Sequence, residues 1–108
     1  MIRRLSVQDV SAMRERGQPM LLIDVREADE YALTRIEGAV LIPMSEFAVR
    51  VAEIQPEANE PVVLMCHHGV RSLRCGMFLA QSGVDGVANM DGGIDAWSRE
   101  IDPTIRTY

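Results

Sequence analysis

Several features that mark other classes of protein are missing from this sequence of 108 residues. It has two cysteines, Cys66 and Cys75, which are too few for the disulfide framework of a small secreted domain. No apolar run approaches the ~20 residues that a membrane-spanning helix needs, and no apolar stretch follows the two arginines near the N-terminus, as it would in an export signal. These absences predict reduced thiols, no membrane span and a cytoplasmic location.

An excess of positive charge is also missing, because 11 basic residues face 16 acidic ones and leave a net charge of −5. This balance argues against nonspecific nucleic-acid binding. The sequence has no internal repeat, low-complexity tract or linker, and 47% of its residues are hydrophobic. We therefore expect residues 1–108 to form a single domain with its own core, and we predict no cofactor.

Short apolar segments alternate along the chain with segments of helical pattern. Buried strands are expected over 20–25, 39–42 and 61–65, and a last short strand over 84–90. One helix is expected before these strands, over 7–16. Further helices are expected between the strands, over 28–33, 45–54 and 71–81, and a last one around Trp97. Such alternation predicts an α/β fold with a mostly parallel sheet, helices on both faces and ligands at the carboxyl ends of the strands.

The most informative stretch covers residues 66–72 and reads Cys-His-His-Gly-Val-Arg-Ser. It follows the expected strand 61–65 and leads into the helix 71–81, so Cys66 is placed where first-turn N–H groups have no partner within the helix. Both histidines of the chain and two arginines, Arg71 and Arg74, lie in this region without any carboxylate. Such surroundings favour the thiolate form of a cysteine, which is its nucleophilic form. The pattern predicts Cys66 as a nucleophile that acts on an anionic substrate.

Four blocks of residues, in this order and spacing, resemble the rhodanese (sulfurtransferase) family. They are 22–26 followed by Glu30-Tyr31, then 36–39 leading to Ile42-Pro43, then 66–72, and finally Gly92-Gly93 with Trp97. The resemblance covers nearly the whole chain, from Leu5 to Trp97. It implies a parallel five-stranded sheet flanked by helices, with the loop after the fourth strand holding a cysteine persulfide.

The same resemblance implies a reaction. Cys66 would attack the outer sulfur of thiosulfate or another small anionic sulfane donor, hold it as a persulfide and release it to cyanide or a thiol. Loop amides would stabilise charge on the transferred sulfur. The implied substrate-binding residues are His67, His68, Gly69, Val70, Arg71 and Ser72. The tail over 101–108 is similar to the tails of rhodanese domains fused to ubiquitin-activating-like enzymes, which allows a sulfur-carrier protein as acceptor.

Other functions stay open at this point. A non-catalytic, partner-binding module could keep the fold while Cys66 carries no sulfur. A small phosphatase or arsenate reductase is disfavoured, because four residues separate Cys66 from Arg71, whereas the related phosphatases that resemble the cell-cycle dual-specificity group have five. A metal centre of Cys66, His67 and His68 is also disfavoured, since adjacent side chains point in different directions, so no metal is predicted.

Some neighbouring side chains have two candidate roles each. Arg71 either contacts the anionic donor or ties the loop to nearby carbonyls and carboxylates. The two histidines either line the entrance or are simply solvated. Asp24 and Arg26 are expected to form an ion pair or hydrogen bonds that brace the loop, and Cys75 is expected to pack in the core without a bridge to Cys66.

Overall fold

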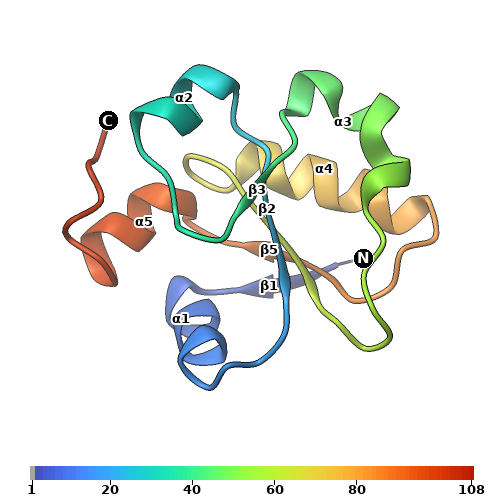
Figure 1. Ribbon diagram of the computed structural model, residues 1–108, viewed down its shortest axis with the longest axis horizontal. Coiled ribbons are helices and arrows are strands. Elements are labelled where there is room, and N and C mark those ends of the chain that lie inside the picture. The colour runs from blue at the N-terminus through green and yellow to red at the C-terminus, as the bar shows by residue number, and fades with distance from the viewer. Residues whose placement is uncertain (1) are drawn as a thin grey trace.

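The computed structural model describes residues 2–108 as a five-stranded sheet with helices on both faces (Figure 1). The strands are β1 (Arg3–Leu5), β2 (Leu21–Asp24), β3 (Val40–Leu41), β4 (Val62–Met65) and β5 (Val87–Met90). The helices are α1 (Val7–Glu15), α2 (Ala28–Leu33), α3 (Met44–Arg50), α4 (Val70–Gln81) and α5 (Gly93–Glu100). Within this described range, no helix combines the length and the apolar character needed to cross a membrane.

The strands lie in the order β1-β5-β4-β2-β3, and every neighbouring pair is parallel. The predicted α/β class and the five-stranded parallel sheet are therefore confirmed. Parallel strands need a crossover connection, and each crossover here carries a helix onto one face of the sheet. The carboxyl ends of β2 and β4, which pair with each other, consequently meet at the same edge, where β4 leads into the loop that holds Cys66.

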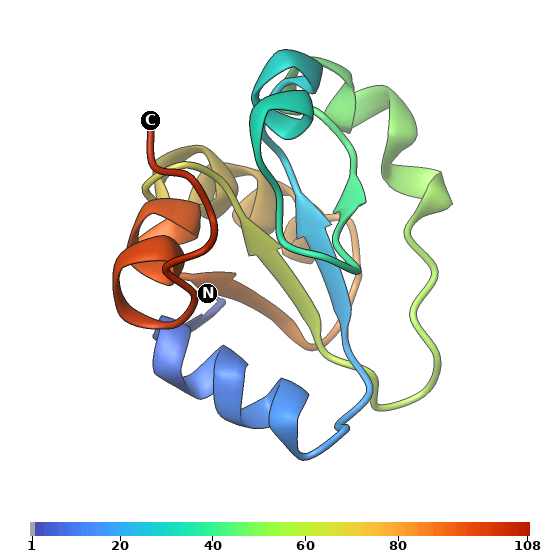
Figure 2. The ribbon, with the colours of Figure 1, turned by 60° about the vertical axis from the view of Figure 1, so that its left-hand side comes forward.

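The central strands are buried on both faces because alternate side chains enter two separate cores. In β4, Val63 and Met65 belong to the core shared with α1 and α5, whereas Val62 and Leu64 belong to the core shared with α3 and α4. Figure 2 shows α1 and α5 on one side of the sheet and α3 on the other. Every residue of β4 is buried, so the strand that leads to Cys66 is held from both sides.

Both edges of the sheet differ from the sequence prediction. Strand β1 was not predicted, because only Leu5 of its three residues is buried and the two arginines before it are exposed. The strand predicted over 39–42 is present as β3, but it is shorter and not buried as expected: it lies at the opposite edge, and Val40 is 46% exposed. The segment 45–54 also departs from a single helix, since α3 ends at Arg50 and a 3₁₀ turn, Val51–Glu53, follows it.

Candidate active site

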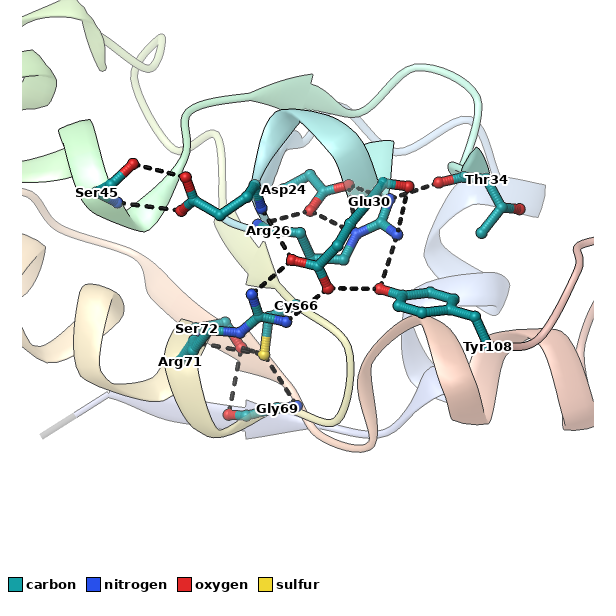
Figure 3. A network of polar contacts seen from close by, with 11 residues as sticks. Asp24, Arg26, Glu30, Thr34, Ser45, Cys66, Gly69, Arg71, Ser72 and Tyr108 are labelled. Carbon is teal, nitrogen blue, oxygen red and sulfur yellow. Dashed lines mark hydrogen bonds and ion pairs between the residues drawn. The ribbon is translucent and has the colours of Figure 1, made fainter. Parts of the chain in front are cut away.

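Cys66 follows β4 at its carboxyl end, and only 1% of its surface is exposed. Its Sγ atom accepts hydrogen bonds from the backbone N–H groups of Gly69, at 3.1 Å, and Ser72, at 3.4 Å (Figure 3). Gly69 is the N-cap of α4 and Ser72 lies in its first turn, where N–H groups have no partner within the helix. The sulfur therefore lies in a cradle of backbone donors suited to negative charge.

The start of α5 gives this loop its shape. The N–H of Ile94 donates to the carbonyl oxygen of Cys66 at 2.9 Å, and the N–H of Asp95 donates to that of His67 at 3.1 Å. A Cβ atom at Gly93 would collide with both carbonyl oxygens, and Gly93 also has a positive φ of 61°. These two contacts hold the start of the loop against α5, and the N–H groups of Gly69 and Ser72 farther along it face the sulfur. The close approach explains why a glycine stands at this position.

Arg71 is bound to α2. Its two terminal nitrogens donate to the two carboxylate oxygens of Glu30 at 2.7 and 2.9 Å. Hydrogen bonding to Arg71 lowers the pKa of Glu30 to about 2, and the same pair raises the pKa of Arg71. Glu30 is thus ionised at neutral pH and offsets the charge of Arg71. Of the two roles considered for Arg71, the structure shows the tie to a neighbouring carboxylate.

Asp24 and Arg26 form the expected ion pair. Arg26 Nη2 lies 2.7 Å from Asp24 Oδ2, and both side chains are fully buried. Arg26 also donates to the carbonyl oxygens of Thr34, at 2.7 Å, and Glu30, at 3.3 Å, which lie in and just after α2. A buried guanidinium is tolerated only when its donors find partners, and here those partners hold α2 against the end of β2. The pair therefore fixes the helix that supplies Glu30 to Arg71.

The C-terminal segment returns to the site, and sequence reasoning missed this. The ring of Tyr108 stacks on that of His67, with centroids 3.9 Å apart and planes 4° from parallel. The Tyr108 hydroxyl donates to Glu30 at 2.8 Å and accepts from Arg26 at 3.0 Å. Burial raises the pKa of Tyr108, while burial and the neighbouring His68 lower the pKa of His67. The tail thus covers one side of the loop, and the burial of His67 favours its neutral imidazole although the Tyr108 backbone acts in the opposite direction.

The remaining predicted residues lie around the loop. His68 and Val70 are exposed, with Val70 at 62%. Ligand atoms of His67, His68 and Asp95 lie within 4.8 Å of one another, which is a different group from the Cys-His-His set considered from the sequence. Cys75 is free and buried, and burial raises its pKa to about 11, as expected for a packing residue.

The amino-acid sequence is similar to one described protein family and to several known proteins. A family profile described as "Rhodanese-like domain" matches residues 6–100. A protein of Allochromatium vinosum named "Sulfurtransferase" is 31% identical over 105 residues, which cover 97% of this chain and 96% of that protein. The "Thiosulfate sulfurtransferase GlpE" of Actinobacillus pleuropneumoniae is 33% identical over 87 residues, covering 81% of this chain and 79% of that protein.

Solved structures agree with these sequence matches. The crystal structure of a rhodanese-like domain protein from Staphylococcus aureus superimposes with a TM-score of 0.82 at 26% identity, covering 99% of both chains. Some relatives are much longer: the chain spans 24% of the length of the maize protein "Adenylyltransferase and sulfurtransferase MOCS3-1". The same kind of domain therefore also occurs as one part of larger proteins.

Proposed function

The chain belongs to the rhodanese-like domain family, a family of sulfurtransferases, and from this premise we propose that Cys66 takes up a sulfane sulfur and passes it to an acceptor. One observation carries the proposal: the buried Sγ of Cys66 accepts two backbone hydrogen bonds at the N-terminus of α4. A hydrogen bond to a charged group contributes about 1.5–3 kcal/mol, so two of them favour the thiolate substantially.

The proposed reaction has two displacement steps. The Cys66 thiolate attacks the outer sulfur of the donor, the bond between that sulfur and the rest of the donor breaks, and its electron pair leaves with the donor remnant, which is sulfite when the donor is thiosulfate. The acceptor then attacks the outer sulfur of the Cys66 persulfide, and the electrons of the sulfur–sulfur bond return to Sγ. The N–H groups of Gly69 and Ser72 stabilise the anionic sulfur at the beginning and at the end of the cycle.

We assign the other predicted residues to the walls of this site. The backbone of residues 67–72 forms the anion cradle, His67, His68 and Val70 line its outer side, and Arg71 shapes the loop through Glu30. A small anionic donor fits the donor-rich loop, with cyanide or a thiol as acceptor. A sulfur-carrier protein is a further proposed acceptor, because the tail over 101–108 resembles those of rhodanese domains fused to ubiquitin-activating-like enzymes. Residues 1–108 are proposed to act as a single domain.

Turnover assays with defined donors test this function. Thiosulfate, mercaptopyruvate and glutathione persulfide are each supplied with cyanide, and thiocyanate is measured. We expect turnover with at least one donor, loss of turnover in Cys66→Ser and retention in Cys75→Ser, which is the matched control because Cys75 is a buried packing residue. No turnover with any donor would favour the binding module instead. Hydrolysis of an aryl phosphate without thiocyanate release would favour the phosphatase.

A further inference from the structure

Asn89 is a polar residue inside the fully buried strand β5, and it is 1% exposed. Its Nδ2 donates to the carbonyl oxygen of Gly69 at 3.2 Å and to Asp91 Oδ1 at 2.8 Å. Its Oδ1 lies 2.5 Å from the hydroxyl oxygen of Ser72. Asn89 therefore binds the same two residues, Gly69 and Ser72, whose backbone N–H groups donate to Cys66 Sγ.

The direction of each hydrogen bond follows from the chemistry of the partners. A carbonyl oxygen at Gly69 and a carboxylate at Asp91 only accept, so the amide of Asn89 presents its NH₂ group to them and its oxygen to Ser72. The Ser72 hydroxyl must then donate to Asn89. Its oxygen lies farther from its two other neighbours, 3.2 Å from the carbonyl of Gly69 and 3.4 Å from Cys66 Sγ. Because a hydroxyl has one proton, that proton belongs to Asn89.

We propose that Asn89 is a positioning residue that makes the Ser72 hydroxyl an acceptor, and not a donor, toward the sulfur of Cys66. This inference rests on the proposed function of Cys66. The neutral thiol can donate its S–H to a lone pair of Ser72. The thiolate can attract the hydroxyl proton only by leaving the oxygen of Asn89 buried without a donor, which is unfavourable.

The consequence concerns how strongly the sulfur reacts. With the hydroxyl held by Asn89, the hydrogen-bond donors to a negatively charged Cys66 are the backbone N–H groups of Gly69 and Ser72. A third donor would increase the fraction of thiolate but lower its intrinsic nucleophilicity, because nucleophilicity falls as a thiolate becomes more stable. Asn89 thus preserves the intrinsic nucleophilicity of the thiolate at the expense of a smaller thiolate fraction.

Other charged and titratable groups lie on the loop and on the elements packed around it. Arg71 and Cys75 interact electrostatically with Cys66, and the packed elements also carry Glu30, the pairs Arg26–Asp24 and Arg4–Asp91, and the loop residues His67 and His68. Of these groups, Asp91 is the one that accepts a hydrogen bond from the Asn89 side chain, and Asn89→Leu removes that donor. A change in the reactivity of Cys66 on substitution of Asn89 therefore reports on the contact with Ser72 and Gly69.

Two substitutions of similar size at Asn89 are expected to differ in their effect, because one removes the acceptor for Ser72 and the other keeps it. Reactivity is followed as the rate of iodoacetamide alkylation against pH, in a Cys75→Ala background so that only Cys66 reacts. Asn89→Leu removes the acceptor and lets the Ser72 hydroxyl turn to the sulfur, so the midpoint of the curve falls by about one pH unit and the plateau rate falls about threefold. Asn89→Asp keeps the acceptor for Ser72, and its carboxyl group retains a proton because it is buried beside the Asp91 carboxylate, so the midpoint stays within about half a pH unit of the native value.

Ser72→Ala tests the same proposal through the pH midpoint of alkylation and leaves Asn89 in place. It removes the acceptor for the thiol proton and removes no donor to the thiolate, so the midpoint stays unchanged or falls. A rise of about one pH unit in Ser72→Ala would show that Ser72 donates to the thiolate in the native protein, and would overturn the proposal. The proposal also fails if Asn89→Leu melts as a folded protein without lowering the midpoint, or if Asn89→Asp lowers it as much as Asn89→Leu does.

This experiment needs no sulfur donor. If the native protein never takes up sulfur, the proposed function fails while the alkylation curves still decide the role of Asn89. If the curves behave as expected but turnover is absent, Asn89 positions Ser72 in a protein with another activity. The two failures are therefore distinguishable.

Discussion

The contact between Gly93 and the Cys66 loop can be tested with a single methyl group. Gly93→Ala places a Cβ atom against the carbonyl oxygens of Cys66 and His67, which α5 binds through the N–H groups of Ile94 and Asp95. Either the loop or the start of α5 must move. The N–H groups that face the sulfur belong to the same loop, so stability and thiol reactivity are expected to change together.

The expected magnitude has two parts. A side chain in the left-handed region costs about 1–2 kcal/mol relative to glycine, and Gly93 has a φ of 61°. Displacement of two hydrogen bonds adds about 1 kcal/mol for each, so the total loss of stability is about 3–4 kcal/mol. Gly17→Ala is the matched control, because Gly17 has a similar φ of 69° and nothing lies within 4 Å of the position that a methyl group would take there. That variant should lose only the first part.

Urea unfolding, followed by the fluorescence of the single tryptophan Trp97, measures the stability of both variants. Iodoacetamide alkylation at pH 7, in a concentration of urea well below either midpoint, measures Cys66. Loss of one N–H donor to Cys66 Sγ lowers the thiolate fraction about tenfold and raises the intrinsic nucleophilicity of the remaining thiolate about threefold. The two effects together should lower the alkylation rate of Gly93→Ala about threefold. Equal losses of stability in Gly93→Ala and Gly17→Ala, with unchanged alkylation in both, would refute the role given to this contact.

Three further predictions concern the groups around the loop. The pKa of Glu30 is lowered by Arg71 from its ordinary value of 4.5 to about 2, so its contribution to stability is present above pH 4.5 and is lost as the pH falls toward 2. Glu30→Gln should therefore be about 1–2 kcal/mol less stable than the native protein at pH 7 in urea unfolding, with a difference that shrinks in acid, and a difference independent of pH would contradict the ion pair. Tyr108→Ala uncovers the imidazole of His67, so the pKa of His67 should rise toward 6.5 in an NMR titration. Tyr108→Phe keeps the ring and should leave the pKa of His67 nearly unchanged. Equal titration curves for the native protein and Tyr108→Ala would argue against the stacked arrangement. Because burial raises the pKa of Cys75 to about 11, the native protein should take up one equivalent of iodoacetamide at pH 8, and rapid uptake of two would show that Cys75 is accessible.

The central part of the fold could be predicted from the sequence because its signal is local. Strand β4 is a continuous apolar run and β2 is apolar up to Asp24, as expected of buried parallel strands, and the segment after β4 carries its chemistry in consecutive residues. The edges gave no comparable signal. Strand β1 has three residues and one buried side chain, so its hydrophobicity did not mark it as a strand. Strand β3 has two residues, neither of them buried, so the apolar run around it wrongly suggested a buried strand.

The supporting residues of the site could not be predicted for a different reason. Glu30 lies 41 positions before Arg71 in the chain and Tyr108 lies 78 positions after Glu30, so their contacts exist only once the sheet has brought the loops together. Asn89 was hidden inside a strand pattern, and its one distinguishing sign was a polar side chain where burial was expected. An amide in a buried strand must find partners, and this rule was the available clue that Asn89 had a function.

Sulfur uptake by Cys66 tests the central claim most directly. The native protein, Cys66→Ala and Cys75→Ala are each incubated with thiosulfate or glutathione persulfide, and the intact mass of each is measured before any acceptor is added. The account predicts a gain of one sulfur atom in the native protein and in Cys75→Ala, its loss on addition of cyanide, and no gain in Cys66→Ala. The absence of any gain in the native protein with both donors, or a gain that persists in Cys66→Ala, would contradict it.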